Sequence, residues 1–160
     1  MLRDNAGALA FYGSNGFVVD GIEKTVELGD EGPSMDCPYC LIRDPEQEVV
    51  FESDLVRFLQ DRRHQGALKH SGVIIPIKHR ETVFDLSDAE IAATFQLLSR
   101  VKTWMDREFL PDGYNIGWNC GRVGGQELFH AHMHVIPRFR QEPLAGKGIR
   151  SLLKSDANRW

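Results

Sequence analysis

Short apolar runs, several with a two-residue alternation, dominate the chain from Glu48 onward and predict β-strands. The run Ser71–Ile77 is almost continuously apolar and contains Pro76 near its end, as expected for a buried central strand. Residues 48–52 and 55–60 flank the turn-forming pair Ser53-Asp54, which predicts a hairpin. The predicted strands are 48–52, 55–60, 71–77, 114–118 and 128–136.

One longer segment has helical periodicity. Ser87 and Glu90 have the spacing of a capping box, in which each side chain bonds the backbone N–H of the other residue. The predicted helix ends near Phe109, before the Pro-Asp-Gly turn at 111–113. Its predicted core-facing stripe is Ile91, Phe95, Leu98, Val101 or Lys102, and Met105.

The segment 128–136 contains candidate functional residues as well as a predicted strand. His130, His132 and His134 alternate with apolar residues, so in a strand the three imidazoles share one face. Buried imidazoles need polar partners, which predicts a metal ion, a phosphate, or both against that face. The alternatives are hydrogen-bonded structural histidines and a three-histidine metal site, although neighbouring imidazoles on one strand reach a single ion more easily in pairs.

Three cysteines are present, and two of them form the motif Cys37-Pro-Tyr-Cys40. An odd number with no secretion signal argues against a disulfide framework. The motif is either a redox pair or half of a zinc site. A redox pair normally follows a buried strand, and no such strand is predicted before Cys37. We therefore favour zinc, which requires two further ligands.

Composition limits the class of protein. The 160 residues suit one soluble domain, and the formal net charge of −4 argues against nonspecific nucleic-acid binding. We predict neither a membrane span nor a signal peptide, and hence a cytoplasmic protein.

Residues 1–34 form a predicted N-terminal extension, with a helix ended by Gly13 and Gly16 and two extended segments at 17–20 and 22–28. The extension resembles the C-terminal helix and strand of the Gcn5-type acetyltransferase family. It lacks the glycine-rich loop that such enzymes use to bind acetyl-CoA, which excludes that activity. It is a fusion remnant, an upstream extension or an arm on a dimer. The second predicted domain is 35–160, with a basic C-terminal tail that carries Arg138, Arg140, Lys147, Arg150 and Lys154.

Several motifs together resemble the histidine-triad family of nucleotide hydrolases and transferases. The segment 130–136 is similar to the family signature His-φ-His-φ-His-φ-φ, where φ is apolar. Asn119-Cys-Gly, Gly125-Gln126 and Pro137-Arg138 are similar to the residues that flank it, and 73–79 resembles the strand ending in Ile-Pro-Lys-x-His. The resemblance spans about Cys37 to Arg140. It implies an α+β fold, a five-stranded, mostly antiparallel sheet with one long helix packed on it, and a two-fold dimer through that helix and a strand.

The resemblance also implies roles for individual residues. His132 would be the nucleophile and His134 would hold a phosphate oxygen or the bridging oxygen. Asn119, Gln126 and the amides around Gly125 would donate to phosphate. Asp61 is the nearest match to the acidic residue that binds ribose hydroxyls; the alternative is a solvated, charged loop. Glu127 stands where many relatives carry Ser or Thr, and His70-Ser71 replaces their Gly-His.

In some relatives two cysteines, the Pro-x-x-His histidine and the first triad histidine bind structural zinc. In this chain that set is Cys37, Cys40, His79 and His130. Four ligands complete a tetrahedron and leave no open position for water.

The resulting hypothesis is a nucleotide hydrolase or nucleotidyl transferase that cleaves at an α-phosphate through a nucleotidyl-histidine intermediate. Dinucleoside polyphosphates, nucleoside phosphoramidates and adenylylated small molecules all present that group. Two other classes stay open: a metal-dependent hydrolase with the triad as zinc ligands, and a nucleotide-binding module without turnover.

Overall fold

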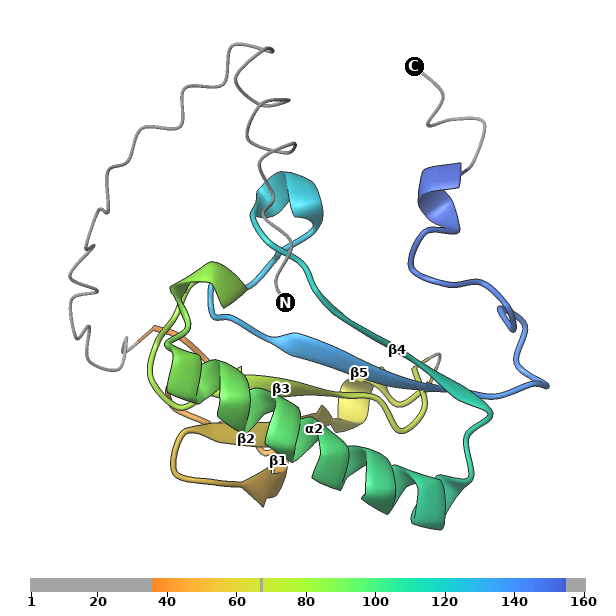
Figure 1. Ribbon diagram of the computed structural model, residues 1–160, viewed down its shortest axis with the longest axis horizontal. Coiled ribbons are helices and arrows are strands. Elements are labelled where there is room, and N and C mark those ends of the chain that lie inside the picture. The colour runs from red at the N-terminus through yellow and green to blue at the C-terminus, as the bar shows by residue number, and fades with distance from the viewer. Residues whose placement is uncertain (1–35, 67, 155–160) are drawn as a thin grey trace, which may run out of the picture.

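The computed structural model describes residues 36–66 and 68–154 (Figure 1). The predicted extension 1–34 lies outside the described residues. Five strands form one antiparallel sheet in the order β1-β2-β3-β5-β4. The strands are β1 (Gln47–Glu52), β2 (Val56–Asp61), β3 (Gly72–Pro76), β4 (Gly113–Trp118) and β5 (Met133–Arg138).

In the described residues one long helix, α2 (Asp88–Phe109), lies across one face of this sheet (Figure 1). Its predicted capping box is present: Ser87 accepts from the Glu90 N–H, and the Glu90 carboxylate accepts from the Ser87 N–H. Short 3-10 turns occur as well, η1 (Arg62–His64), η2 (Val83–Asp85), η3 (Arg122–Gly124) and η4 (Leu152–Lys154). None of the described helices is long and apolar enough to cross a membrane. The predicted α+β fold is confirmed.

The face of α2 that packs on the sheet differs from the predicted stripe in its first two turns and agrees with it at Val101 and Met105, which are buried. Ile91 and Phe95 are 38% and 51% exposed, whereas the buried positions begin with Glu90 and Thr94. These polar residues tolerate burial because they are hydrogen-bonded; Thr94 Oγ1 donates to Glu90 O at 2.7 Å. The core between α2 and the sheet comprises Val56, Phe58, Ile74, Leu97, Val101, Met105, Met133 and Val135.

The histidine-rich strand is shorter than predicted. β5 begins at Met133; a bend at 128–130 and two irregular residues, 131–132, lead into it. His130 and His132 therefore precede the strand, and His134 is the only triad histidine within it. The predicted strand at 128–136 is wrong in its first half because the backbone there is held by other segments instead of by a neighbouring strand. Ala131 N–H donates to Arg80 O at 2.6 Å.

The second face of the sheet leaves space for a site. Successive strand residues point to opposite faces, so Leu59, Val73 and His134 lie away from the core residues Phe58, Ile74 and Val135. Gly72 allows the close approach of β2 and β3. A Cβ at Gly72 would lie 2.4 Å from Leu59 O, so a larger residue would push the two strands apart.

Candidate functional site

A cavity of about 280 Å³ lies on the face of the sheet that α2 does not cover. His132, His134 and Glu127 contribute a polar end, and aliphatic side chains such as Leu59 and Val73 contribute an apolar surface. Pockets of this kind, apolar with a few converging polar groups, are typical of small-molecule sites.

His132 has a defined tautomer. Its Nδ1 lies 2.7 Å from the backbone oxygen of His130. A carbonyl oxygen only accepts, so Nδ1 carries the proton and Nε2 of the neutral ring carries the lone pair. The side chain is buried yet lines the cavity. His132 is therefore arranged as a nucleophile or as a metal ligand through Nε2.

His134 lies beside it, with the two ring centroids 4.9 Å apart at an angle of 78°. Burial lowers the pKa of His134, and the neighbouring His132 lowers it further. His134 Nε2 is buried and has no hydrogen-bond partner. A buried, unpaired ring nitrogen is costly, so this atom is suited to a ligand atom such as a phosphate oxygen.

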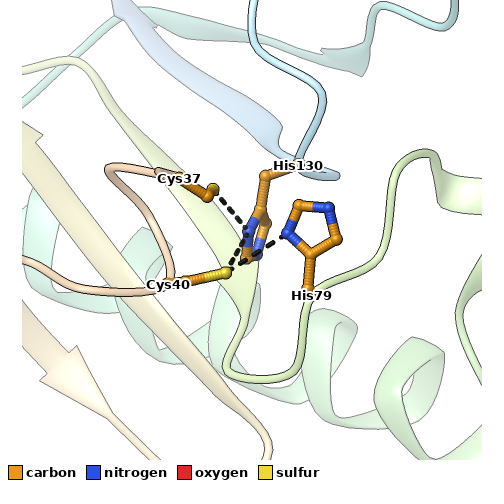
Figure 2. Close-up of side chains that lie close together, drawn as sticks. All are labelled: Cys37, Cys40, His79 and His130. Atoms are coloured by element: carbon orange, nitrogen blue, oxygen red, sulfur yellow. Dashed lines mark hydrogen bonds between the residues drawn. The ribbon is translucent and has the colours of Figure 1, made fainter. Parts of the chain in front are cut away.

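The predicted metal ligands come together. Cys37, Cys40, His79 and His130 form one group in which the potential ligand atoms all lie within 4.8 Å of one another (Figure 2). His130 Nδ1 lies 3.4 Å from Cys37 Sγ and 3.6 Å from Cys40 Sγ, and His79 Nδ1 lies 3.2 Å from Cys40 Sγ. A tetrahedral zinc ion with two sulfur and two nitrogen ligands separates S from N by about 3.5 Å. The four residues therefore fit zinc in both chemistry and spacing.

A hydrogen bond orients the His130 ring so that Nδ1 faces the cysteines. Its Nε2–H donates to Pro76 O at 2.9 Å, which directs the Nδ1 lone pair toward the cysteines. Burial lowers the pKa of His130 to about 4, so the ring is neutral, as a metal ligand must be. In the described part of the chain, the group of possible ligands includes neither His132 nor His134. The triad is thus divided between two sites.

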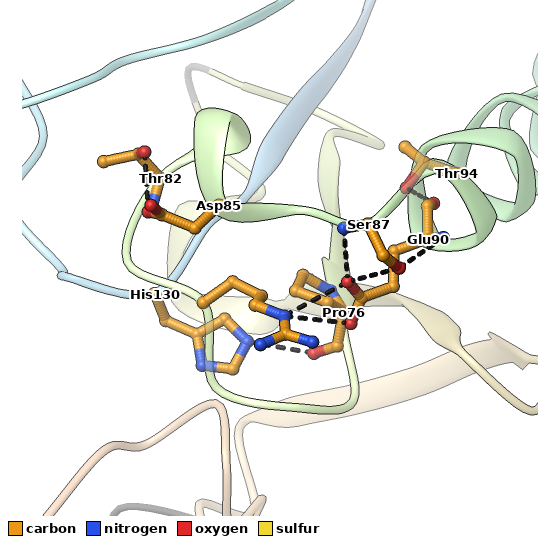
Figure 3. A network of polar contacts seen from close by, with 8 residues as sticks. Pro76, Thr82, Asp85, Ser87, Glu90, Thr94 and His130 are labelled. Atoms are coloured by element: carbon orange, nitrogen blue, oxygen red, sulfur yellow. Dashed lines mark hydrogen bonds and ion pairs between the residues drawn. The ribbon is translucent and has the colours of Figure 1, made fainter. Parts of the chain in front are cut away.

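A polar network at the start of α2 lies beside Pro76 and His130 (Figure 3). Arg80 Nε donates to the two carboxylate oxygens of Glu90 at 3.2 and 3.1 Å, and Glu90 also accepts from Ser87. Burial favours the neutral acid, but the hydrogen bonds from Ser87 and Arg80 keep the pKa of Glu90 below its ordinary value. Arg80 follows His79 directly, and its carbonyl holds Ala131 between His130 and His132.

The predicted phosphate donors do not line the cavity in this structure. Gln126 is buried, and its amide donates to Glu81 O at 2.6 Å and Leu128 O at 3.1 Å. Asn119 donates to Gly125 O at 3.3 Å, and Gly125 adopts a left-handed conformation with a φ of 85°. The structure thus brings these three residues together as supports of the loop that precedes the histidines.

Asp61 does line the cavity. Arg63 donates to it three times, from its backbone N–H at 2.9 Å and from Nε and Nη2 at 3.0 and 2.6 Å. The hydrogen bond from the Arg63 side chain lowers the pKa of Asp61, which is therefore an anion at neutral pH.

Sequence reasoning missed Tyr39 and Gln47, which also line the cavity. The Tyr39 ring meets the rings of His130 and His132 edge-on at 5.8 Å, and burial raises the pKa of Tyr39 to about 12, so its hydroxyl remains a donor. Its position inside the cysteine motif was a usable signal. No sequence signal identified Gln47, because its place in the cavity depends on the register of β1 against β2.

Comparison with known proteins agrees with this geometry. The family model of the HIT domain matches residues 43–141, more than half of the chain. Adenosine 5'-monophosphoramidase of Schizosaccharomyces pombe is 31% identical, covering 71% of this chain and 83% of the relative. Purine nucleoside phosphoramidase of Escherichia coli is 33% identical, covering 67% and 90%.

The fold is similar to solved structures. The crystal structure of a HIT family member from Bacillus subtilis superposes with a TM-score of 0.60 at 31% identity, covering 67% of this chain and 76% of that protein. The family match over 43–141 and the similarity of the fold to a solved member of that family agree. This chain belongs to the HIT domain family.

Proposed function

We propose that this protein hydrolyses or transfers nucleotides by cleavage at the α-phosphate, through a nucleotidyl intermediate on His132. His132 Nε2 attacks the α-phosphorus, a P–N bond to the ring forms, and the bond to the leaving group breaks. The leaving group takes a proton from solvent. Water then attacks the phosphorus and the P–N bond breaks, so that the hydroxyl of the water joins the released nucleoside monophosphate, its second proton returns to solvent and the imidazole regains its lone pair. The observation that carries this proposal is the bond from His132 Nδ1–H to the His130 carbonyl, which leaves Nε2 unprotonated beside the cavity.

His134 supports the transferred group. Its ring is adjacent to His132 and its buried Nε2 is unpaired. With a proton on that nitrogen, it donates to a phosphate oxygen or to the bridging oxygen, where negative charge accumulates in the transition state.

The leaving group is more consistent with an amine than with a polyphosphate. Glu127 lines the cavity together with both catalytic histidines. A carboxylate there repels a polyphosphate tail and accepts a hydrogen bond from an amine. Two relatives carry the names of phosphoramidases. We therefore rank a nucleoside phosphoramidate above a dinucleoside polyphosphate as the substrate.

We further propose that Cys37, Cys40, His79 and His130 bind structural zinc. The S–N spacings and the neutral state of His130 support it. A bound ion would join the cysteine motif to the segment that carries His132, and the chemistry itself would stay with the imidazoles.

A homodimer is also proposed. Ile91 and Phe95 are exposed on the side of α2 that does not pack on the sheet, and the Phe95 ring lies 6.2 Å from that of Trp118 on the edge strand β4. An apolar surface beside a strand edge suits a second copy of the chain. Replacing Phe95 with Glu should shift the sedimentation coefficient to that of a monomer.

Mass spectrometry of the quenched reaction tests the proposed chemistry. The protein is mixed with adenosine 5′-phosphoramidate or with a diadenosine polyphosphate and quenched during turnover. An acid-labile adenylyl adduct is expected with wild type and not with His132→Gly, whose rate should fall by roughly 10⁴-fold or more. In Glu127→Gln, the preference for the phosphoramidate over the diadenosine polyphosphate should be smaller than in wild type.

The same experiment separates the two other classes. A metal-dependent hydrolase would show no adduct, and its metal content would fall in His132→Gly. A nucleotide-binding module would bind AMP with neither adduct nor turnover.

A further inference from the structure

Arg138 ends β5, and the proposed chemistry does not use it. Its side chain is only 20% exposed. The guanidinium donates to four acceptors: the Glu142 carboxylate, Asn115 Oδ1, Lys147 O at 2.8 Å and Leu144 O at 2.7 Å. Two of these acceptors are backbone oxygens of residues 144–149, here called the tail segment. A guanidinium presents its donors in a rigid fork, so Arg138 fixes where the tail segment lies.

The tail segment lies on the same face of the sheet as the catalytic histidine of β5. Positions 134 and 138 of that strand point to one face because side chains alternate. Asn115 of β4, which accepts from Arg138, belongs to that face too. The tail segment turns back from the end of β5 and runs beside β4 (Figure 1). It therefore covers part of the face that α2 leaves open.

Ile149 comes close to His134 on this face. Gly117 of β4 lies directly opposite His134, and a Cβ at Gly117 would be 3.5 Å from Ile149 Cδ1. Cβ positions of directly opposed residues are about 5 Å apart, so Ile149 Cδ1 is no more than about 9 Å from the Cβ of His134. The Ile149 side chain is 64% exposed and can contact a bound molecule.

The direction of the substrate places its leaving group on this side. The cavity extends from β5 toward β1, and β4 lies on the other side of β5. The nucleoside is the larger, partly apolar portion of the substrate and fills the cavity. In phosphoryl transfer the leaving group departs in line with the attacking nitrogen and away from it. A leaving group held by His134 therefore extends over Gly117 toward Ile149.

We propose that Ile149 is a specificity-determining residue for the leaving group and that Arg138 positions it through the tail segment. This inference rests on the proposed function and refines its substrate class: phosphoramidates whose leaving amine carries an apolar substituent. The amine is favoured by Glu127, and the substituent by Ile149. Neither Ile149 nor Arg138 takes part in bond breaking.

Steady-state kinetics with two substrates test the proposal. The substrates are adenosine 5′-phosphoramidate and its N-butyl derivative, and the quantity compared between variants is the ratio of their kcat/KM values. Partial unfolding lowers both values equally, so the ratio reports the leaving-group contact and not stability. The variants are Ile149→Ser and Arg138→Met. The control is Leu144→Ser, which removes an equally exposed apolar side chain from the same tail segment.

The ratio of the N-butyl to the unsubstituted substrate should fall by roughly tenfold in Ile149→Ser, as expected for the loss of an apolar contact. Arg138→Met should lower the ratio similarly, and the double variant should show no further fall because both changes remove one contact. Leu144→Ser should keep the wild-type ratio.

Binding provides a readout that is independent of turnover. His132→Gly cannot form the proposed adduct, so its affinity for both nucleotides can be measured by calorimetry. The N-butyl derivative should bind more tightly than the unsubstituted nucleotide, and Ile149→Ser in this background should remove that difference.

Two results would overturn the role of Ile149: a wild-type ratio in Ile149→Ser, or an equal fall in Leu144→Ser. Replacing an exposed side chain does not endanger the fold, so this arm gives an answer in any case. A wild-type ratio in Arg138→Met would overturn the role of Arg138. In each of these cases the adduct on His132 still forms and the proposed function stands. If wild type neither binds nor cleaves either nucleotide, both proposals fail together.

Discussion

Two histidines only two residues apart have opposite tautomers, and a backbone carbonyl determines each one. His130 donates from Nε2 to Pro76 O, whereas His132 donates from Nδ1 to His130 O. The lone pair of the first ring consequently faces the two cysteines, and that of the second is left on Nε2 beside the cavity. A local hydrogen bond thus separates the proposed metal ligand from the proposed nucleophile within a single motif.

The lowered pKa of His134 predicts that the protein loses stability in mild acid. Since the folded-state pKa lies below the ordinary value of 6.5, the unfolded chain binds the proton more readily. The free energy of unfolding should therefore fall as the pH drops from about 6.5 toward the lower, folded-state pKa. Urea titrations of wild type and His134→Asn at pH 7.5 and 5.5 measure this. The free energy of unfolding of wild type minus that of His134→Asn should be smaller at pH 5.5 than at pH 7.5. An equal difference at the two pH values would contradict the expectation.

At the scale of elements, the start of α2 also binds a side chain from the loop after β3. Glu90 closes the capping box with Ser87 and also receives Arg80, whose backbone holds the segment between His130 and His132. Arg80 and Glu90 have side-chain exposures of only 12% and 3%. One carboxylate therefore links the helix, the loop after β3 and the segment that carries His130 and His132.

Arg80→Met should lower the free energy of unfolding by roughly 3 kcal/mol, because it leaves the Glu90 carboxylate buried without its cation. The double variant Arg80→Met with Glu90→Gln should recover part of that loss. The control is Lys102→Met, which removes an ion pair with Asp106 on the exposed surface of the same helix and should cost less than about 1 kcal/mol. Urea unfolding gives all three values. Equal losses of unfolding free energy in Arg80→Met and Lys102→Met would show that the buried ion pair contributes no more to stability than the exposed one.

At the scale of the whole molecule, the proposed zinc site joins segments far apart in the chain. Cys37 and His130 are 93 residues apart, and His79 comes from the loop after β3. An ion that binds only the folded arrangement stabilises it by mass action. The cysteine motif also places Tyr39 against His132, so the proposed metal site and the cavity share a wall.

Removal of metal should therefore lower the melting temperature. Protein dialysed against a strong chelator should melt several degrees lower than untreated protein, and stoichiometric zinc should restore the original value. Cys40→Ser should melt at the lower temperature with or without zinc, whereas Cys120→Ser should respond like wild type. Thermal unfolding with metal analysis of each sample provides the measurement. An unchanged melting temperature after complete removal of metal would refute a stabilising role.

Much of the fold could be predicted because its causes are local. The capping box at Ser87, the hairpin at Ser53-Asp54 and the apolar run before Ile77 each depend on residues close together in the chain, and the elements they predict are present. The face of the first two turns of α2 could not be predicted, because a helix with apolar residues on two sides packs on whichever side its neighbours complete, whereas Val101 and Met105 are buried as predicted. Glu90 and Thr94 are inside since Arg80, Ser87 and the helix backbone satisfy them.

The sequence by itself determined which residue types are available for chemistry: three alternating histidines, a Cys-x-x-Cys motif and a histidine after a strand. Only the tertiary structure decided which partners satisfy them. It leaves His130 beside the cysteines and His132 beside the cavity, as the family resemblance implied. It also uses the amide of Gln126, which was expected at a phosphate, to support a loop, and it places Gln47 opposite Asp61. The physical reason is that a side chain's role depends on the partner that satisfies it, and these partners come from other strands and loops, at distances along the chain that no local pattern encodes.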